Sequence, residues 1–247
     1  MSARDASPSR SDTRPQAARA ARHVLARVGA RFLEQGGEAT GTVLDPVDVT
    51  FGIGRLDPGL YQGLAGLAVT YAVAGSLFDE DEHRRCAAAA MQLAAQAIAG
   101  GALDRTEIGL EGSGGLLWAA TAVLRSHDGE DGPACEAARR VVRSSAEALL
   151  ARLRGRRRAV NVDLMGGEAG ALCAIATTIE AELVAGAVLE AAARRLIDLL
   201  VDAAEVTGDG VAWPLWDERA RIVGLGHGSA GIAWALHRGA AVLGHRR

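Results

Sequence analysis

The chain has 247 residues, a formal net charge of -3 at pH 7, and 49% hydrophobic but only 4% aromatic residues. This length fits one large core, so we expect a single domain, and its apolar mass of Ala, Leu and Val favours packed helices over a sheet. The small net charge gives no electrostatic reason to expect a nucleic acid partner or an acidic membrane. The sequence shows no apolar signal segment and no membrane-spanning run, so a cytoplasmic location is expected by default.

Residues 1–14 have no apolar period and predict a disordered tail ahead of a single domain over residues 15–247. From Pro15 to about Leu33, apolar residues recur at helical spacing between arginines, which predicts an amphipathic helix. Residues 36–59 are rich in Gly, Thr, Asp and Pro, so they predict a long loop with a short extended piece at 47–51.

From Leu60 onward, a pair of glycines recurs four times, each time at the start of an apolar stretch of helical length. The pairs are Gly63/Gly66, Gly112/Gly115, Gly167/Gly170 and Gly228/Gly231. Their spacing of roughly 50 to 60 residues is typical of a repeat architecture. The helix after each pair is apolar nearly all round and therefore buried, and amphipathic helices are expected at about 81–99, 133–154 and 185–204. Alternating buried and surface helices predict a two-layered helical barrel or solenoid.

The glycines also predict a crowded rim, because a missing Cβ lets backbones approach closely. Helix N-termini gather at the same end, and their N–H groups favour an anionic or electron-rich ligand. His227 lies between two glycines just before the fourth apolar helix, and Asp163 has a comparable place before the third. Taken singly, His227 is more often structural and Asp163 an N-cap. Together they form a candidate acid–base pair.

Three further patterns have weaker chemical meanings. The segment 226–231 matches G-x-G-x-x-G, but no acidic residue follows at the distance that a dinucleotide site needs, and Ser229 lacks the first glycine of a hydrolase elbow. The arginine-rich run 152–158 could hold a phosphate or an acidic peptide, or form a solvated helix end. Trp213 and Trp216 could line a pocket or pack an outer loop.

The cysteines do not indicate a metal site. Cys86, Cys135 and Cys173 are widely spaced and form no Cys-x-x-Cys pair, which argues against a disulfide framework and a compact zinc knuckle. Cys86 and Cys173 lie in alanine-rich stretches, so we interpret them as small core residues.

Four segments, LYQGLAGLA, IGLEGSGGLLWA, VDLMGGEAGAL and GLGHGSAGIAWAL, cover about residues 60–240 in this order. They resemble the successive inner-helix motifs of lanthionine synthetase C-like cyclases, especially the cyclase domains of class II lanthipeptide synthetases. The resemblance implies an all-α toroid of two concentric helical layers, with seven inner helices in a complete member. About four of the seven are expected here, so the α/α toroid would be incomplete.

The family reaction adds the thiol of a peptide cysteine to dehydroalanine or dehydrobutyrine and closes a thioether, or lanthionine, ring. The resemblance therefore implies a precursor peptide as substrate. By motif match, His227 takes the place of the histidine proposed to protonate the enolate, and Asp163 that of the aspartate that accompanies it.

In the family, zinc is bound by two cysteines and a histidine from Trp-Cys-x-Gly and Cys-His-Gly motifs downstream of the histidine segment. This sequence contains neither motif, so no zinc and no activity are expected of the chain alone. Two functions remain open: a cyclase component completed by a second chain, and a non-catalytic peptide-binding module or truncated remnant. A partial ring would also expose apolar helices that favour self-association. A glycoside-processing or terpenoid-cyclising toroid is disfavoured, because paired carboxylates on one helix turn and an aspartate-rich metal motif are both missing.

Overall fold

The computed structural model describes residues 10–34, 40–45, 50–61, 63–105, 107–127, 132–183, 186–208, 210–214 and 222–244. The helices are α1 (Arg10–Glu34), α2 (Leu64–Phe78), α3 (Asp81–Ala99), α4 (Ser113–Ser126), α5 (Pro133–Leu153), α6 (Glu168–Glu180), α7 (Gly186–Asp202) and α8 (Ser229–Gly244), with a short 3₁₀ turn, η1 (Ala102–Arg105). The strands are β1 (Thr40–Asp45), β2 (Thr50–Arg55), β3 (Glu205–Thr207) and β4 (Gly210–Ala212). They form only two separate hairpins, so the predicted all-α class is confirmed.

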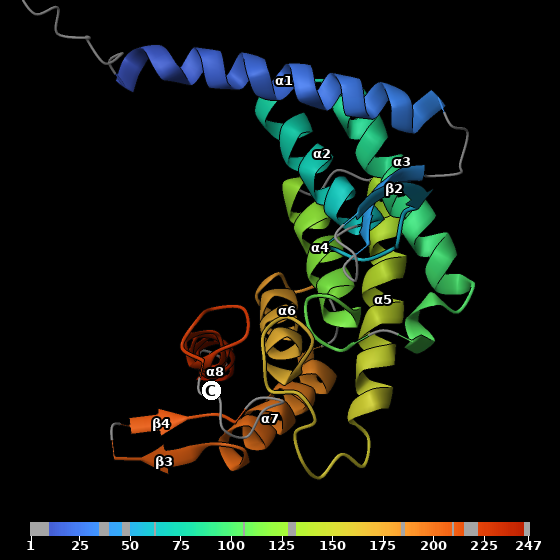
Figure 1. The fold of residues 1–247 in the computed structure, drawn as a ribbon. Coiled ribbons are helices and arrows are strands. Elements are labelled where there is room, and N and C mark those ends of the chain that lie inside the picture. Colours follow the sequence, from blue (N-terminus) through green and yellow to red (C-terminus); the bar gives the residue numbers. More distant parts are fainter. Residues whose placement is uncertain are drawn as a thin grey trace, which may run out of the picture.

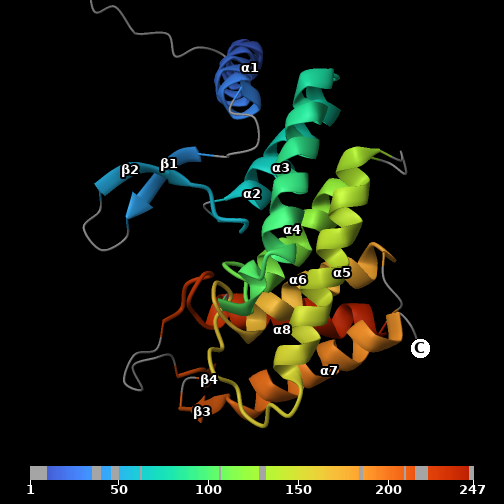
Figure 2. The same ribbon diagram turned by 90° about the vertical axis from the view of Figure 1, so that its right-hand side faces the viewer.

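Helices α2 to α8 form two layers that curve together, and α1 lies across one end of them (Figures 1 and 2). Helices α2, α4, α6 and α8 make the inner layer, in which each packs against the next. Helices α3, α5 and α7 make the outer layer, and each of them packs on the inner helix that precedes it in the chain. The described residues thus form an arc of two helical layers with four inner helices, as the repeats predict and as the resemblance to a two-layered α/α toroid implies.

The burial of the central helices α4, α5 and α6 follows their sequence patterns. Helix α6 is buried on every side from Glu168 to Ile179 except at Thr177, and α4 is nearly as enclosed. Helix α5 instead buries one stripe, which includes Ala138, Val142 and Leu149, and exposes its arginines Arg139, Arg140 and Arg143. The prediction of two kinds of helix is confirmed for α4, α6 and α5, but it is wrong that every inner helix is buried all round, because α2 and α8 each expose several residues, among them Leu77 and Trp234.

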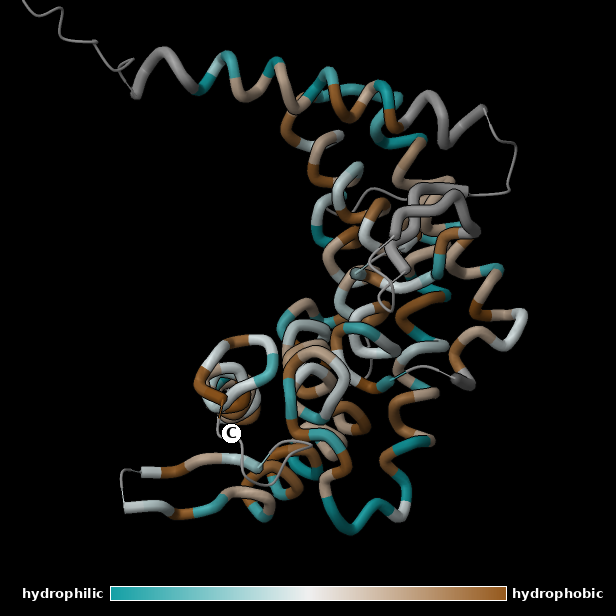
Figure 3. Tube along the Cα trace, viewed as in Figure 1, coloured by the Kyte–Doolittle hydropathy of each residue, from teal (hydrophilic) through white to brown (hydrophobic). Residues whose placement is uncertain are grey.

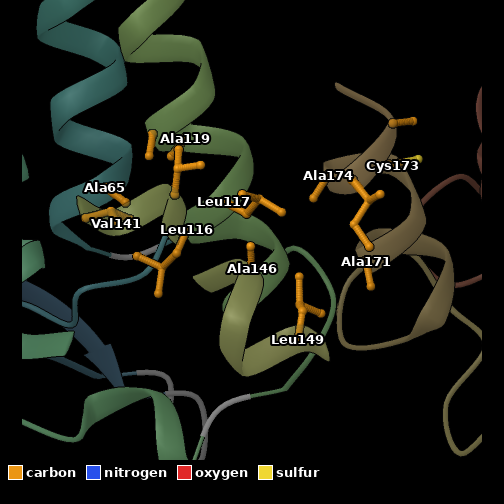
Figure 4. Packing of buried hydrophobic residues seen from close by; sticks show 14 of the residues in the cluster. Ala65, Leu116, Leu117, Ala119, Val141, Ala146, Leu149, Ala171, Cys173 and Ala174 are labelled. Carbon is orange, nitrogen blue, oxygen red and sulfur yellow. The ribbon is translucent and has the colours of Figure 1, made fainter. Parts of the chain in front are cut away.

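Small side chains dominate the core between the layers (Figure 4). Ala65, Ala119 and Ala174 are fully buried, and larger residues such as Leu117 and Leu149 fill the space between helices. A polar contact joins two neighbouring inner helices, because the buried hydroxyls of Thr121 in α4 and Thr178 in α6 lie 3.0 Å apart. By contrast, the arginine-rich turn after α5 is the hydrophilic loop at the bottom of Figure 3.

The N-terminal third differs from the prediction. Helix α1 begins at Arg10 rather than Pro15, so the predicted tail over 1–14 is wrong for residues 10–14, and residues 1–9 lie outside the described part. The predicted loop contains an antiparallel hairpin, in which Thr40 pairs with Arg55 and Asp45 with Thr50. Its alternating Thr, Val and Ile residues favour strands, and the glycines between them concealed this signal. The extended piece expected at 47–51 overlaps β2 only at residues 50 and 51, while 46–49 are not described.

The hairpin β3–β4 is a second element that the sequence pattern did not predict. No helix in the described ranges is both long enough and apolar enough to cross a membrane.

Candidate functional site

The four glycine pairs each hold a loop against the first turn of an inner helix. The first glycine of each pair lies directly before α2, α4, α6 or α8. A Cβ on these four glycines would lie 2.0 Å from Asp57 O, 1.6 Å from Glu107 O, 1.9 Å from Asn161 O and 2.5 Å from Ile222 O, respectively. On the second glycines it would lie 2.2 Å from Leu60 O, 1.9 Å from Leu110 O, 2.0 Å from Leu164 O and 1.9 Å from Leu225 O. The close approach is thus made mainly by the loop of the same repeat.

These loop carbonyls also accept the N–H groups at the start of each inner helix. The first helical N–H donates over 2.8 Å from Leu64 to Asp57, 2.9 Å from Ser113 to Glu107, 2.7 Å from Glu168 to Asn161 and 2.9 Å from Ser229 to Ile222. Helix termini that are satisfied in this way have fewer donors left for a ligand. The expectation that open N-termini bind an anion at the rim is therefore wrong for these four N–H groups.

The rim itself is confirmed, because loops of successive repeats are joined through their backbones. The N–H of Leu110 donates to Leu164 O over 3.2 Å, and that of Glu111 to Met165 O over 2.8 Å. The N–H of Leu164 in turn donates to Gly226 O over 3.1 Å. Residues 107–112, 161–167 and 222–228 thus form one continuous surface.

This surface brings together the two site residues predicted from the sequence. His227 Nδ1 lies 2.6 Å from Asp163 Oδ2. The Asp163 side chain is 2% exposed and that of His227 is 49% exposed. Asp163 Oδ1 accepts the N–H groups of Gly166 (2.8 Å) and Gly167 (3.1 Å). An ionised carboxylate only accepts hydrogen bonds, so Nδ1 of His227 carries the proton that it donates to Asp163.

The loop that carries Asp163 is anchored by a buried carboxylate that sequence reasoning missed. Glu168 is fully buried at the start of α6, and its two oxygens accept the N–H groups of Val160 and Asn161, each over 3.0 Å. Arg156 forms an ion pair with the same carboxylate. Asn161 Oδ1 accepts the Asp163 N–H over 3.2 Å. The N-cap of α6 is Gly167, so Asp163 braces the turn before the helix without being its cap.

Among the residues that the structure describes, the surroundings of the pair are open rather than enclosed. On the same rim, Leu225 is 58% exposed, Tyr61 is 69% exposed, and Glu107 and Glu111 are exposed. A cavity of about 560 Å³ lies elsewhere, between the starts of α3 and α5 and the end of α4, and His127 and Arg85 are among the residues that line it. It lies at the opposite end of α4 from Gly112 and takes no part in this site.

The structure gives the three cysteines no role as zinc ligands. Burial, with the nearby charge of Glu82, raises the pKa of Cys86 to about 11. Burial raises the pKa of Cys173 to about 12, although Arg238 opposes this. Cys135 is also buried. Among the residues that the structure describes, no three His, Cys, Asp or Glu side chains are placed to hold a metal ion. These residues do not fit the family's zinc site, so no step below is assigned to zinc.

The remaining patterns have structural roles where they are described. Trp213 is 7% exposed and its Nε1 donates to Leu200 O over 2.7 Å, so it packs against α7. Trp216 lies outside the described residues. Within the run 152–158, Arg156 is the arginine engaged with Glu168. No β-strand is assigned to the described residues 222–225 before Gly226, so the dinucleotide motif lacks its strand there.

A comparison with protein families gives a match over most of the chain. A search of curated proteins gives no match. The family model described as lanthionine synthetase C-like protein matches residues 54–246, a range that contains all four glycine pairs and the His227–Asp163 pair. The chain therefore belongs to the lanthionine synthetase C-like family.

Proposed function

We propose that the chain is the proton-handling component of a lanthionine-forming cyclase that acts on a precursor peptide. Membership of the family supports the cyclase role. The observation that carries the specific step is the half-exposed His227, held at 2.6 Å by a buried Asp163 on the glycine rim.

In the proposed step, a peptide thiolate adds to Cβ of dehydroalanine or dehydrobutyrine. A C–S bond forms, the C=C π bond opens, and the electron pair moves to Cα as an enolate. Protonated His227 then donates its Nε2 proton to Cα, because Nδ1 is engaged with Asp163. Over the whole addition the thiol loses one proton and Cα gains one, so neither an oxidant nor a reductant is needed.

Asp163 has a positioning role in this proposal. Its carboxylate fixes the orientation of the His227 ring, and two backbone N–H groups keep the carboxylate in place. Because the described residues do not fit a zinc site, we propose that a second polypeptide with Trp-Cys-x-Gly and Cys-His-Gly motifs activates the thiol and completes the enzyme. The alternative is a module that binds the peptide without catalysis.

The test is ring formation in a reconstituted mixture of this chain, a polypeptide with those two motifs, and a dehydrated precursor peptide. Mass spectrometry after thiol alkylation counts the cysteines that have not reacted. We expect His227→Asn to lower the rate by about 100-fold or more, the usual contribution of a general acid. We expect Asp163→Asn to lower it as well. His23→Asn, a matched change on an exposed residue of α1, should leave the rate unchanged.

Co-purification separates the candidate functions. If His227→Asn still assembles with its partner and closes rings at the normal rate, the proposed role of His227 is wrong. If no mixture closes rings although the chain binds the precursor peptide, the binding module is the correct function.

A further inference from the structure

The turn between α5 and α6 carries a concentration of positive charge that the proposed reaction does not use. Five of the seven residues 152–158 are arginines, although the chain has a formal net charge of -3. Arg154, Arg157 and Arg158, here called the arginine cluster, are exposed. Within the part of the chain that the structure describes, none of the three forms an ion pair. The cluster therefore presents three guanidinium groups to a partner.

The end of α5 accounts for only part of this charge. Arg152 lies in the last turn of the helix, where the helix dipole favours a cation. That effect falls off within the last turn, whereas Arg157 and Arg158 come four and five residues after Leu153, the last residue of α5. A solvated helix end thus explains Arg152 but not the two later arginines.

Buried contacts hold the turn in one conformation. Arg156, in the same run, forms an ion pair with the fully buried Glu168. Arg195 of α7 donates to Arg156 O, and the N–H of Val160 donates to the Glu168 carboxylate over 3.0 Å. Gly155 has a φ of 70°, which lets the chain turn after α5 without a side-chain clash. The cluster thus extends from a fixed backbone, so less order is lost when it binds a partner.

The segment that carries the cluster continues to the reactive pair (Figure 2). Asp163 follows Arg158 by five residues, so their Cα atoms lie at most about 18 Å apart. Asn161 Oδ1 accepts the Asp163 N–H over 3.2 Å, which fixes the path of the backbone here. Val160, on this path, is 77% exposed and offers an apolar contact. An extended peptide of about six residues can therefore span the distance from the cluster to His227.

We infer that the arginine cluster binds an acidic stretch of the precursor peptide and holds the reacting part of that peptide near His227; this rests on the proposed function. The ligand is a peptide with several Asp or Glu carboxylates, with which guanidinium groups form bidentate hydrogen bonds. The acidic stretch lies about six or more residues from the reacting cysteine or dehydrated residue. Binding away from the reacting atoms stabilises substrate and transition state equally, so it lowers KM and leaves kcat unchanged.

Fluorescence anisotropy measures this binding directly. The probe is a labelled peptide rich in glutamate, and its counterpart has glutamine at every glutamate position. We expect the wild-type chain to bind the first peptide and not the second, and added salt to weaken the binding. The variant Arg154→Gln/Arg157→Gln/Arg158→Gln should raise the Kd about tenfold, because it removes three exposed charge pairs.

The matched control removes three exposed arginines elsewhere. The variant Arg125→Gln/Arg140→Gln/Arg143→Gln, in α4 and α5, makes the same change in net charge and should bind the glutamate peptide as the wild-type chain does. Equal weakening by the two variants would show that only the net charge matters, and it would overturn the inference. So would a glutamate peptide that does not bind, or a phosphoserine peptide that binds while the glutamate peptide does not.

Ring formation in the reconstituted mixture tests the consequence for the reaction. With a precursor peptide that contains an acidic stretch, the cluster variant should raise KM about tenfold at unchanged kcat. With the acidic stretch changed to Asn and Gln, the variant and the wild-type chain should have the same KM, and a difference that persists would contradict the inference. The anisotropy measurement needs neither the second polypeptide nor the reaction, so its failure is distinguishable from a failure of the proposed function.

Discussion

Glycine is needed at the paired positions because neighbouring atoms leave no room for a side chain, and not because the backbone has a positive φ angle. The φ angles of Gly63, Gly112 and Gly167 are -145°, -122° and -113°, so none of the three lies in the left-handed region that favours glycine. What excludes a side chain is the loop carbonyl close to each Cα. The sequence predicted tight packing at these positions, but it could not show that the contact is made by the same repeat, because backbone carbonyls leave no residue pattern.

Gly170→Ala should therefore destabilise the fold strongly. The new Cβ would lie 2.0 Å from Leu164 O and 2.8 Å from Gly109 Cα, so two backbone segments must move. We expect the free energy of unfolding to fall by about 3 kcal/mol, measured by urea titration. Gly208→Ala is the matched control, since nothing lies within 4 Å of its Cβ, and it should change stability by less than about 0.5 kcal/mol. Equal effects of the two substitutions would refute the steric explanation.

The buried thiols predict alkaline sensitivity. Burial raises the pKa of Cys86 to about 11 and that of Cys173 to about 12, from an ordinary value of 9.0. Above pH 9 the unfolded chain releases these protons and the folded chain keeps them, so the free energy of unfolding falls as pH rises towards 11 or 12. Denaturant titrations from pH 8 upward should show this decline. The double variant Cys86→Ala/Cys173→Ala should show a shallower one, and an unchanged slope would contradict the prediction.

Among the secondary-structure elements, the amphipathic helices were predicted correctly from their apolar periodicity, whereas the two hairpins were missed. The amphipathic helices expected at 81–99, 133–154 and 185–204 correspond to α3, α5 and α7. The two hairpins escaped prediction, because β1–β2 is rich in glycine and β3–β4 has only three residues in each strand. In both, cross-strand pairing supplies the stability that local sequence does not reveal.

The loop before α6 depends on one buried carboxylate. Glu168→Gln removes the charge that pairs with Arg156 and accepts two backbone N–H groups, so we expect a loss of about 2 to 3 kcal/mol in unfolding free energy. Glu180→Gln is a suitable control, because Glu180 pairs with Arg238 at 2.6 Å but is 37% exposed. Its effect should stay below about 1 kcal/mol. The prediction is wrong if the two variants lose the same amount of unfolding free energy.

At the scale of the whole molecule, the repeat count predicted the inner layer and the neighbourhood of the site. Asp163 and His227 are 64 residues apart in sequence, and they meet because the third and fourth repeats are adjacent. The sequence could therefore identify the pair. It could not identify Arg156 and Glu168, because their contact joins a loop to the first residue of α6 and depends on how that loop folds.

Each junction between repeats is built from the same loop, leucine and glycine, but only one carries ionisable partners. Counted from the first glycine of each pair, the places of Asp163 and His227 hold Ile108 and Gly166 at the junction between the second and third repeats. The junction between the first and second repeats has Gly59 and Glu111 there. The fold of a junction therefore does not require ionisable residues at these two places. The backbone contacts that join successive repeats are therefore made whichever residues occupy these two places on the rim.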